Sequence, residues 1–76
     1  MTTALEGNAA TKEIVVNGDT VVVSATTMAT LVDELGYGEQ KVATALNGDF
    51  VPARARGGTP VTAGDRIEIV SPRQGG

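Results

Sequence analysis

The sequence predicts a small α+β domain in which one main helix packs on one face of a mixed sheet of four to five strands. Two observations carry this prediction. Runs of β-branched residues are separated by turn signals, including two Asn-Gly pairs, and a single stripe of apolar residues has helical spacing. With 76 residues the chain forms one domain at most, and so short a domain buries only about 60% of the surface that its unfolded chain exposes.

The N-terminal segment is unlike the rest of the chain. Residues 1–11 contain Thr, Ala, Gly and Asn with one Leu, and they show no hydrophobic period. Such a composition buries too little apolar surface to fold, and without basic residues or an apolar stretch it is no signal peptide. The sequence therefore predicts a disordered leader at 1–11, a folded domain at 12–70 and a flexible tail at 71–76. A cytoplasmic location is the default expectation.

The first structured element is a β-hairpin. Two β-branched runs, 13–16 and 21–24, flank Asn17-Gly18. Asn-Gly favours a tight turn because both residues tolerate positive φ. Alternate residues of a strand share a face, so one side of each run should face the core. The residues expected there are Ile14, Val16, Val21 and Val23.

A helix of about ten residues is predicted next, from apolar residues at positions i, i+3, i+4 and i+7. Thr26 or Thr27 can cap its start, and Gly36 can supply the left-handed residue that ends it. A helix this short is marginal alone, so it must lie on the sheet. The stripe consists of Met28, Leu31, Val32 and Leu35.

The second half of the chain predicts three further strands. Residues 42–46 form one, a second Asn-Gly pair follows, and residues 50–52 form a short one ended by proline. We expect a loop at 53–65 with at most one turn, and then a strand at 66–70 whose two isoleucines point inward. This element order is that of the ubiquitin-like β-grasp fold.

Composition excludes several classes of function. The chain has no Cys and no His, which removes the thiolate nucleophile, the commonest general base and the commonest metal ligands. Six Lys/Arg against nine Asp/Glu give a net charge of −3, which disfavours nucleic acid and anionic membranes as partners. We therefore expect no metal, no cofactor bound by this chain, and a monomer when the protein is free.

The C-terminal residues are the most distinctive feature. After Pro72 the chain cannot continue a strand ladder, and the six residues from Ser71 reach at most about 20 Å. Gly75 and Gly76 lack side chains, so the end can enter a narrow tunnel. The terminal carboxylate is ionised at neutral pH, and it can attack the α-phosphate of ATP that another protein binds. The acyl-adenylate formed is then open to a sulfur nucleophile.

Four motifs stand out in the chain: Ile14-Val15-Val16-Asn17-Gly18, Thr30-Leu31, the run from Val42 to Pro52, and the run from Ala63 to Gly76. Through these motifs residues 13–76 resemble the ThiS family of sulfur carriers in thiamine thiazole synthesis. The resemblance implies that a ubiquitin-activating-like adenylyltransferase uses ATP to adenylate Gly76. It also implies that the Gly76 carboxylate then becomes a thiocarboxylate and donates its sulfur to thiazole synthase. On this interpretation the chain is a protein substrate and no enzyme. Arg73, Gln74 and Gly75 would thread the partner's site.

Other residues have less specific roles. Val70 and Phe50 are candidates for partner docking, although Phe50 is favoured as a core residue in so small a domain. We expect Arg54, Arg56 and Arg66 on a solvated face.

Three alternative functions remain open on the sequence. The small subunit of molybdopterin synthase has the same tail chemistry with a different client. A ubiquitin-like modifier would be joined through Gly76 to lysines, and a plain interaction module would not use its tail at all.

Overall fold

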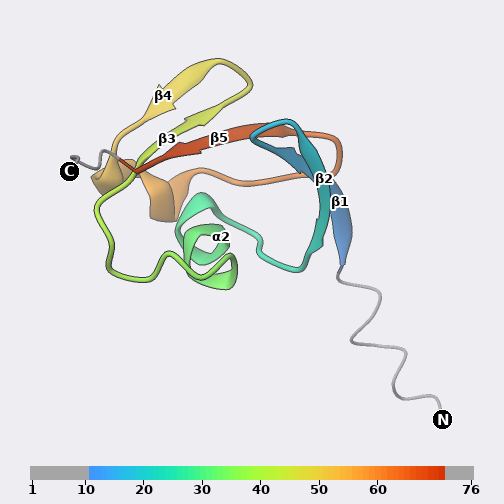
Figure 1. The fold of residues 1–76 in the computed structure, drawn as a ribbon, viewed down its shortest axis with the longest axis horizontal. Helices are drawn as coiled ribbons and strands as arrows, with labels where there is room; N and C mark the ends of the chain where they lie inside the picture. Colours follow the sequence, from blue (N-terminus) through green and yellow to red (C-terminus); the bar gives the residue numbers. More distant parts are fainter. Residues whose placement is uncertain (1–10, 72–76) are drawn as a thin grey trace, which may run out of the picture.

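The computed structural model describes residues 11–71, in which five strands, one α-helix and one 3-10 helix follow one another (Figure 1). The elements are β1 (Lys12–Val16), β2 (Asp19–Val23), α2 (Met28–Glu34), β3 (Ala43–Leu46), β4 (Asp49–Val51), η1 (Ala53–Gly58) and β5 (Arg66–Val70). The strands form one mixed sheet, and α2 lies across one of its faces (Figure 1). The predicted fold class, a ubiquitin-like β-grasp, is confirmed.

The sheet has the order β2-β1-β5-β3-β4, so the last strand lies in its middle. β1 and β5 pair in parallel, with Val15 opposite Arg66. The other pairings are antiparallel, and β3 accompanies β5 as far as the pair of Ala43 and Val70. The two predicted hairpins therefore flank β5, with β1 and β2 on one side and β3 and β4 on the other.

Both hairpin turns contain an asparagine and a glycine with left-handed φ, as the Asn-Gly pairs predict. Asn17 has φ 51° and Gly18 has φ 90°, and Asn47 and Gly48 repeat these values at 50° and 91°. The first turn is so tight that pairing begins directly beside it, and β2 starts two residues earlier than expected, at Asp19.

The helix is shorter than predicted but begins where expected. Thr27 is its N-cap: its hydroxyl accepts the Thr30 backbone N–H at 3.2 Å, and the Thr30 hydroxyl accepts the Thr27 N–H at 3.1 Å. The helix has seven residues because Leu35 already leaves helical geometry and Gly36 follows with φ 92°. This reciprocal capping satisfies backbone donors that the first turn would otherwise leave unpaired.

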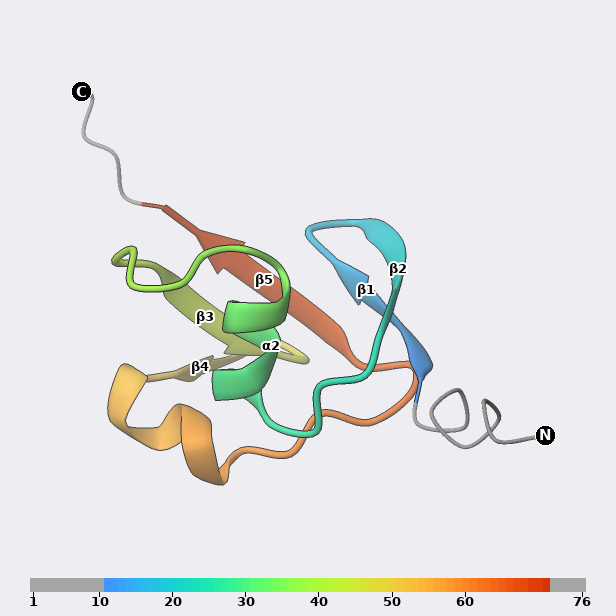
Figure 2. The same ribbon diagram turned by 90° about the horizontal axis from the view of Figure 1, so that it is seen from below.

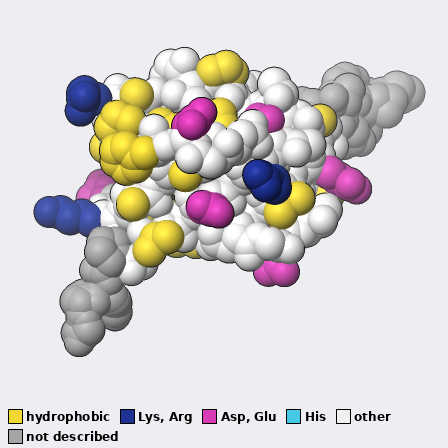
Figure 3. Space-filling view, turned by 90° about the horizontal axis from the view of Figure 1, so that it is seen from above, with side chains coloured by type: hydrophobic (Ala, Val, Ile, Leu, Met, Phe, Trp, Pro, Cys, Tyr) yellow, Lys and Arg dark blue, Asp and Glu magenta, His cyan; other side chains and the backbone are white. Residues whose placement is uncertain are grey.

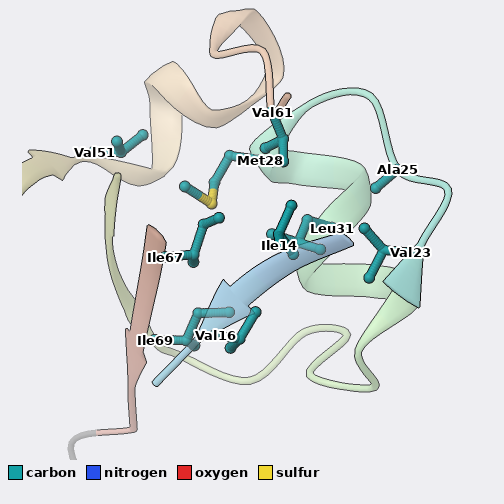
Figure 4. Close-up of a cluster of buried hydrophobic side chains, with 10 residues drawn as sticks. All are labelled: Ile14, Val16, Val23, Ala25, Met28, Leu31, Val51, Val61, Ile67 and Ile69. Atoms are coloured by element: carbon teal, nitrogen blue, oxygen red, sulfur yellow. The ribbon is translucent and has the colours of Figure 1, made fainter. Parts of the chain in front are cut away.

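The core lies between α2 and the sheet (Figure 4). Met28 and Leu31 of α2 are fully buried, and Val32 is nearly so, as the helical stripe predicts. Leu35 and Val21 pack at its margin and are half-buried. The ten side chains of this cluster are Ile14, Val16, Val23, Ala25, Met28, Leu31, Val51, Val61, Ile67 and Ile69.

The segment after β4 is more ordered than a loop with one turn, since η1 occupies six residues of it. Arg56 attaches η1 to β3: its Nε donates to the Thr44 hydroxyl at 3.0 Å, and its Nη2 donates to the Val42 carbonyl at 2.6 Å. The buried Thr44 hydroxyl in turn donates to the Val51 carbonyl at 2.7 Å. The expectation that Arg56 belongs to a solvated face is therefore wrong, because its guanidinium supplies donors to acceptors at the edge of the core.

A polar turn precedes β5. The Asp65 carboxylate accepts hydrogen bonds from the Thr62 N–H at 2.8 Å, the Thr62 hydroxyl at 3.1 Å and the Asn47 amide at 3.1 Å. Burial by itself raises the pKa of Asp65, but these hydrogen bonds and the charge of Lys12 outweigh it and lower the pKa below its ordinary value. The folded state thus favours the ionised form.

We predict that Leu31→Ala lowers the free energy of unfolding by about 2–5 kcal/mol, because it removes most of a fully buried side chain and leaves a cavity in its place. Urea denaturation followed by circular dichroism measures the change. Asp33→Ala, on the exposed face of the same helix, should change stability by no more than about 0.5 kcal/mol. Equal losses in the two variants would contradict the packing of α2 on the sheet.

We also predict that the native chain loses stability on acidification more steeply than Asp65→Asn does. The pKa of Asp65 is lower in the folded than in the unfolded chain, so its contribution is fully present above the unfolded pKa of about 4. This contribution disappears as the pH falls through the folded pKa. Urea midpoints at neutral pH and near pH 3 provide the comparison, and equal acid sensitivity of the two proteins would refute it.

Candidate functional site at the end of β5

The predicted site residues follow β5 in the chain. Ser71 is the last described residue and is exposed, whereas Arg73, Gln74, Gly75 and Gly76 lie outside the described residues, as do residues 1–10. β5 ends on the opposite side of the domain from the start of β1 (Figure 2). The described part of the site is therefore the strand end from which residues 72–76 continue.

The end of β5 is held on both sides, although β1 stops before it. β1 pairs with only the first half of β5, as far as Val16 opposite Ile67. The Asn17 backbone N–H then donates to the Ile67 carbonyl at 2.9 Å. The Asn17 side chain continues the pairing, because its Oδ1 accepts the Ile69 N–H at 2.9 Å and its Nδ2 donates to the Ile69 carbonyl at 3.0 Å. A side-chain amide thus takes the place of a further strand residue.

The second Asn-Gly turn holds the opposite end of β5. The Asn47 N–H donates to the Arg66 carbonyl at 2.7 Å, and Asn47 Oδ1 accepts the Arg66 N–H at 2.8 Å. Asn47 Nδ2 donates to the Asp65 carboxylate. Sequence reasoning missed both roles, since it treated the asparagines only as turn formers. The available signal was the repeated choice of asparagine at a position where glycine would serve the turn equally well.

Two large apolar side chains are exposed in this half of the sheet, Val70 at the end of β5 and Phe50 on the edge strand β4, which β3 separates from β5. Val70 is 58% exposed and Phe50 is 69% exposed. They stand opposite Ala43 and Ala45 respectively, and the alternation of the strands directs them away from α2. The preference for Phe50 as a core residue is wrong, because Val51 is the residue of β4 that turns inward.

The surface at the C-terminal end of the domain combines apolar side chains with charged side chains at their margin (Figure 3). Figure 3 shows apolar side chains gathered at that end. Arg54 and Arg66 are exposed, as expected for a solvated face. The described residues thus combine a strand end of fixed position with an adjacent apolar surface, an arrangement suited to presenting a chain terminus to another protein.

Within residues 11–71 no group of His, Cys, Asp or Glu side chains could hold a metal ion. In the same part of the chain, every buried side-chain nitrogen or oxygen has a hydrogen-bond partner. None of the helices described is long and apolar enough to cross a membrane.

Comparisons with known proteins agree with this architecture. The family model of the ThiS family matches residues 6–76. Among solved structures, the thiamine biosynthesis protein (ThiS) from Geobacter metallireducens is similar, with a TM-score of 0.72 and 26% identity over 84% of this chain and 99% of that chain. No curated protein matches the sequence significantly. Because the family match runs from before β1 through the terminal glycines, this chain belongs to the ThiS family.

Proposed function

We propose that this chain is a sulfur carrier for thiamine (thiazole) biosynthesis and that the carboxylate of Gly76 accepts and donates the sulfur. The observation that carries the proposal is the ThiS family match, which includes the terminal Gly75-Gly76 pair. The similarity to a thiamine biosynthesis protein favours the thiamine branch over molybdopterin synthesis. The central position of β5 supports the proposal, since it provides a rigid base for the reacting end.

In the proposed reaction the Gly76 carboxylate attacks the α-phosphate of ATP bound by a ubiquitin-activating-like adenylyltransferase, and pyrophosphate leaves. Hydrosulfide (HS⁻) from the sulfur source then attacks the acyl carbon and displaces AMP, which leaves a thiocarboxylate. The thiocarboxylate donates its sulfur to thiazole synthase. Within this scheme the chain is a protein substrate, ATP belongs to the partner, and Arg73, Gln74 and Gly75 pass through the partner's site.

The proposed partners are proteins and include neither nucleic acid nor a membrane. The free carrier would be a monomer in the cytoplasm. We propose that Val70 and Phe50 dock these partners, because both are large, apolar and exposed. Val70 ends the strand that leads to Gly76, and Phe50 lies on β4, two strands away in the same half of the sheet. Exposed aromatic side chains often supply much of the binding energy of an interface.

We predict that adding one residue after Gly76, or making Gly75→Val, abolishes conversion to the thiocarboxylate. The extension displaces the reacting carboxylate by a whole residue, and misplacements of about 1 Å already slow a reaction strongly. The valine adds a branched side chain where the partner's tunnel must be narrow. Mass spectrometry of the chain after incubation with the adenylyltransferase, ATP and a sulfur source detects the exchange of one oxygen for sulfur.

The matched control is Gly57→Val, the same substitution in the other glycine pair, where an added Cβ meets no atom within 4 Å. It should be converted at the native rate. Conversion of the extended chain as fast as the native one would exclude Gly76 as the acceptor. Stable adducts on lysines of other proteins, without return to the starting mass, would instead identify a protein modifier.

We predict that Phe50→Ser raises the KM of the carrier for the adenylyltransferase by roughly 5- to 100-fold, the range typical of losing an aromatic anchor from an interface. Its stability should change little, because the ring is mostly exposed. Val22→Ser is the control, since Val22 is 61% exposed but lies on the opposite edge strand. Steady-state kinetics at varied carrier concentration measure this KM. If both variants had the KM of the native chain, docking through Phe50 would be disproved.

A further inference from the structure

We propose that Asn17 is a positioning residue for the reaction at the chain end, because its side-chain amide fixes the point at which the chain leaves the sheet. The kinetic part of this inference rests on the proposed sulfur-carrier function. The structural part, the hold on β5, can be measured on the free protein.

The geometry shows what Asn17 replaces. Along β5, the Ile67 carbonyl accepts the Asn17 backbone N–H, so the polar groups of Ile69, two residues on, face the same side. β1 has already ended there, at Val16. The Asn17 amide meets both Ile69 groups, at 2.9 Å and 3.0 Å. Beyond this point only the pairing of Val70 with Ala43 remains.

The chemistry of asparagine suits this task better than that of the other residues a tight turn accepts. Asn17 has φ 51°, a conformation that glycine, asparagine and aspartate adopt most readily. Glycine has no side chain with which to reach Ile69. An aspartate accepts hydrogen bonds but cannot donate to the Ile69 carbonyl, whereas an asparagine amide does both, as a peptide group does.

The other Asn-Gly turn offers an internal comparison. Asn47 has the same backbone conformation and also precedes a glycine, and its side chain also bonds β5. Its partners are Arg66 and Asp65, at the start of the strand rather than at its end. The two asparagines therefore have similar local chemistry and differ in which end of β5 they hold.

The consequence for the reaction concerns where the last six residues begin. If the end of β5 frays, the free segment grows by about two residues, and loop entropy alone makes that lengthening inexpensive. The larger effect is on position. A partner that contacts both the paired end of β5 and the tail can bind only those molecules in which that end is paired. The apparent affinity is therefore the intrinsic affinity multiplied by the fraction of such molecules.

The test compares Asn17→Gly with Asn47→Gly. Both substitutions tolerate positive φ without strain, and both remove one side-chain amide from β5. Hydrogen exchange of the free protein, followed by NMR, should show the Ile69 amide exchanging roughly 5- to 30-fold faster in Asn17→Gly, as expected for the loss of two hydrogen bonds. In Asn47→Gly the acceleration should appear at Arg66 and not at Ile69.

Kinetics then separate positioning from stability. In ATP–pyrophosphate exchange with the cognate adenylyltransferase, Asn17→Gly should raise the KM for the carrier roughly 3- to 10-fold with kcat within about twofold of native. Asn47→Gly should leave both the KM and kcat near native, although its free energy of unfolding should fall by about as much as that of Asn17→Gly.

Each other result has a definite meaning. Unchanged exchange at Ile69 in Asn17→Gly would overturn the hold on β5. Faster exchange with equal KM values in the two variants would overturn the positioning role and leave Asn17 a stabilising residue only. If the native chain is not activated at all, the proposed function fails and the positioning role with it, whereas the exchange data still decide whether Asn17 holds the strand.

Discussion

The parallel pairing of β1 with β5 is the interaction on which the rest of the structure depends. It joins Val15 to Arg66 and Val16 to Ile67, from opposite ends of the described chain. Parallel neighbours need a long crossover connection, and here α2 lies within it and covers one face of the sheet. Because the pairing puts β5 in the middle of the sheet, the two hairpins must lie on either side of it. The core residues of all these elements then meet beneath α2.

That arrangement has a direct consequence for the site. A terminal strand at a sheet edge would fray easily, but β5 is paired with β3 from Ile67 to Val70 and with β1 at Arg66 and Ile67. The Asn17 side chain extends the second pairing to Ile69. The chain thus reaches its last residues from a base that is held on both sides. The same alternation that buries Ile69 leaves Val70 exposed beside that base, so an anchored end and an apolar surface lie together.

Several differences between expectation and structure share one cause, which is that local patterns cannot identify a residue's distant partner. Phe50 belongs to a strand of three residues, too short for alternation alone to decide which face it takes. Its exposure follows from the pairing of Val51 with Thr44. Arg56 has no sequence neighbour that explains its partial burial, because its acceptors are Thr44 on β3 and Val42 just before β3, 12 and 14 residues away in the chain.

The sequence by itself determined the features that depend on backbone geometry over a few residues: strand alternation, the helical stripe, a threonine cap at residue 26 or 27, the two Asn-Gly turns and the terminal Gly75-Gly76 pair. These patterns, with the resemblance they support, sufficed for the fold class. Only the tertiary structure decided that both asparagines bond β5, that Arg56 joins η1 to β3, and that Phe50 is exposed. Those contacts join residues far apart in the chain. The entropy cost of closing such loops is offset only when the whole core forms together, so no short segment encodes them.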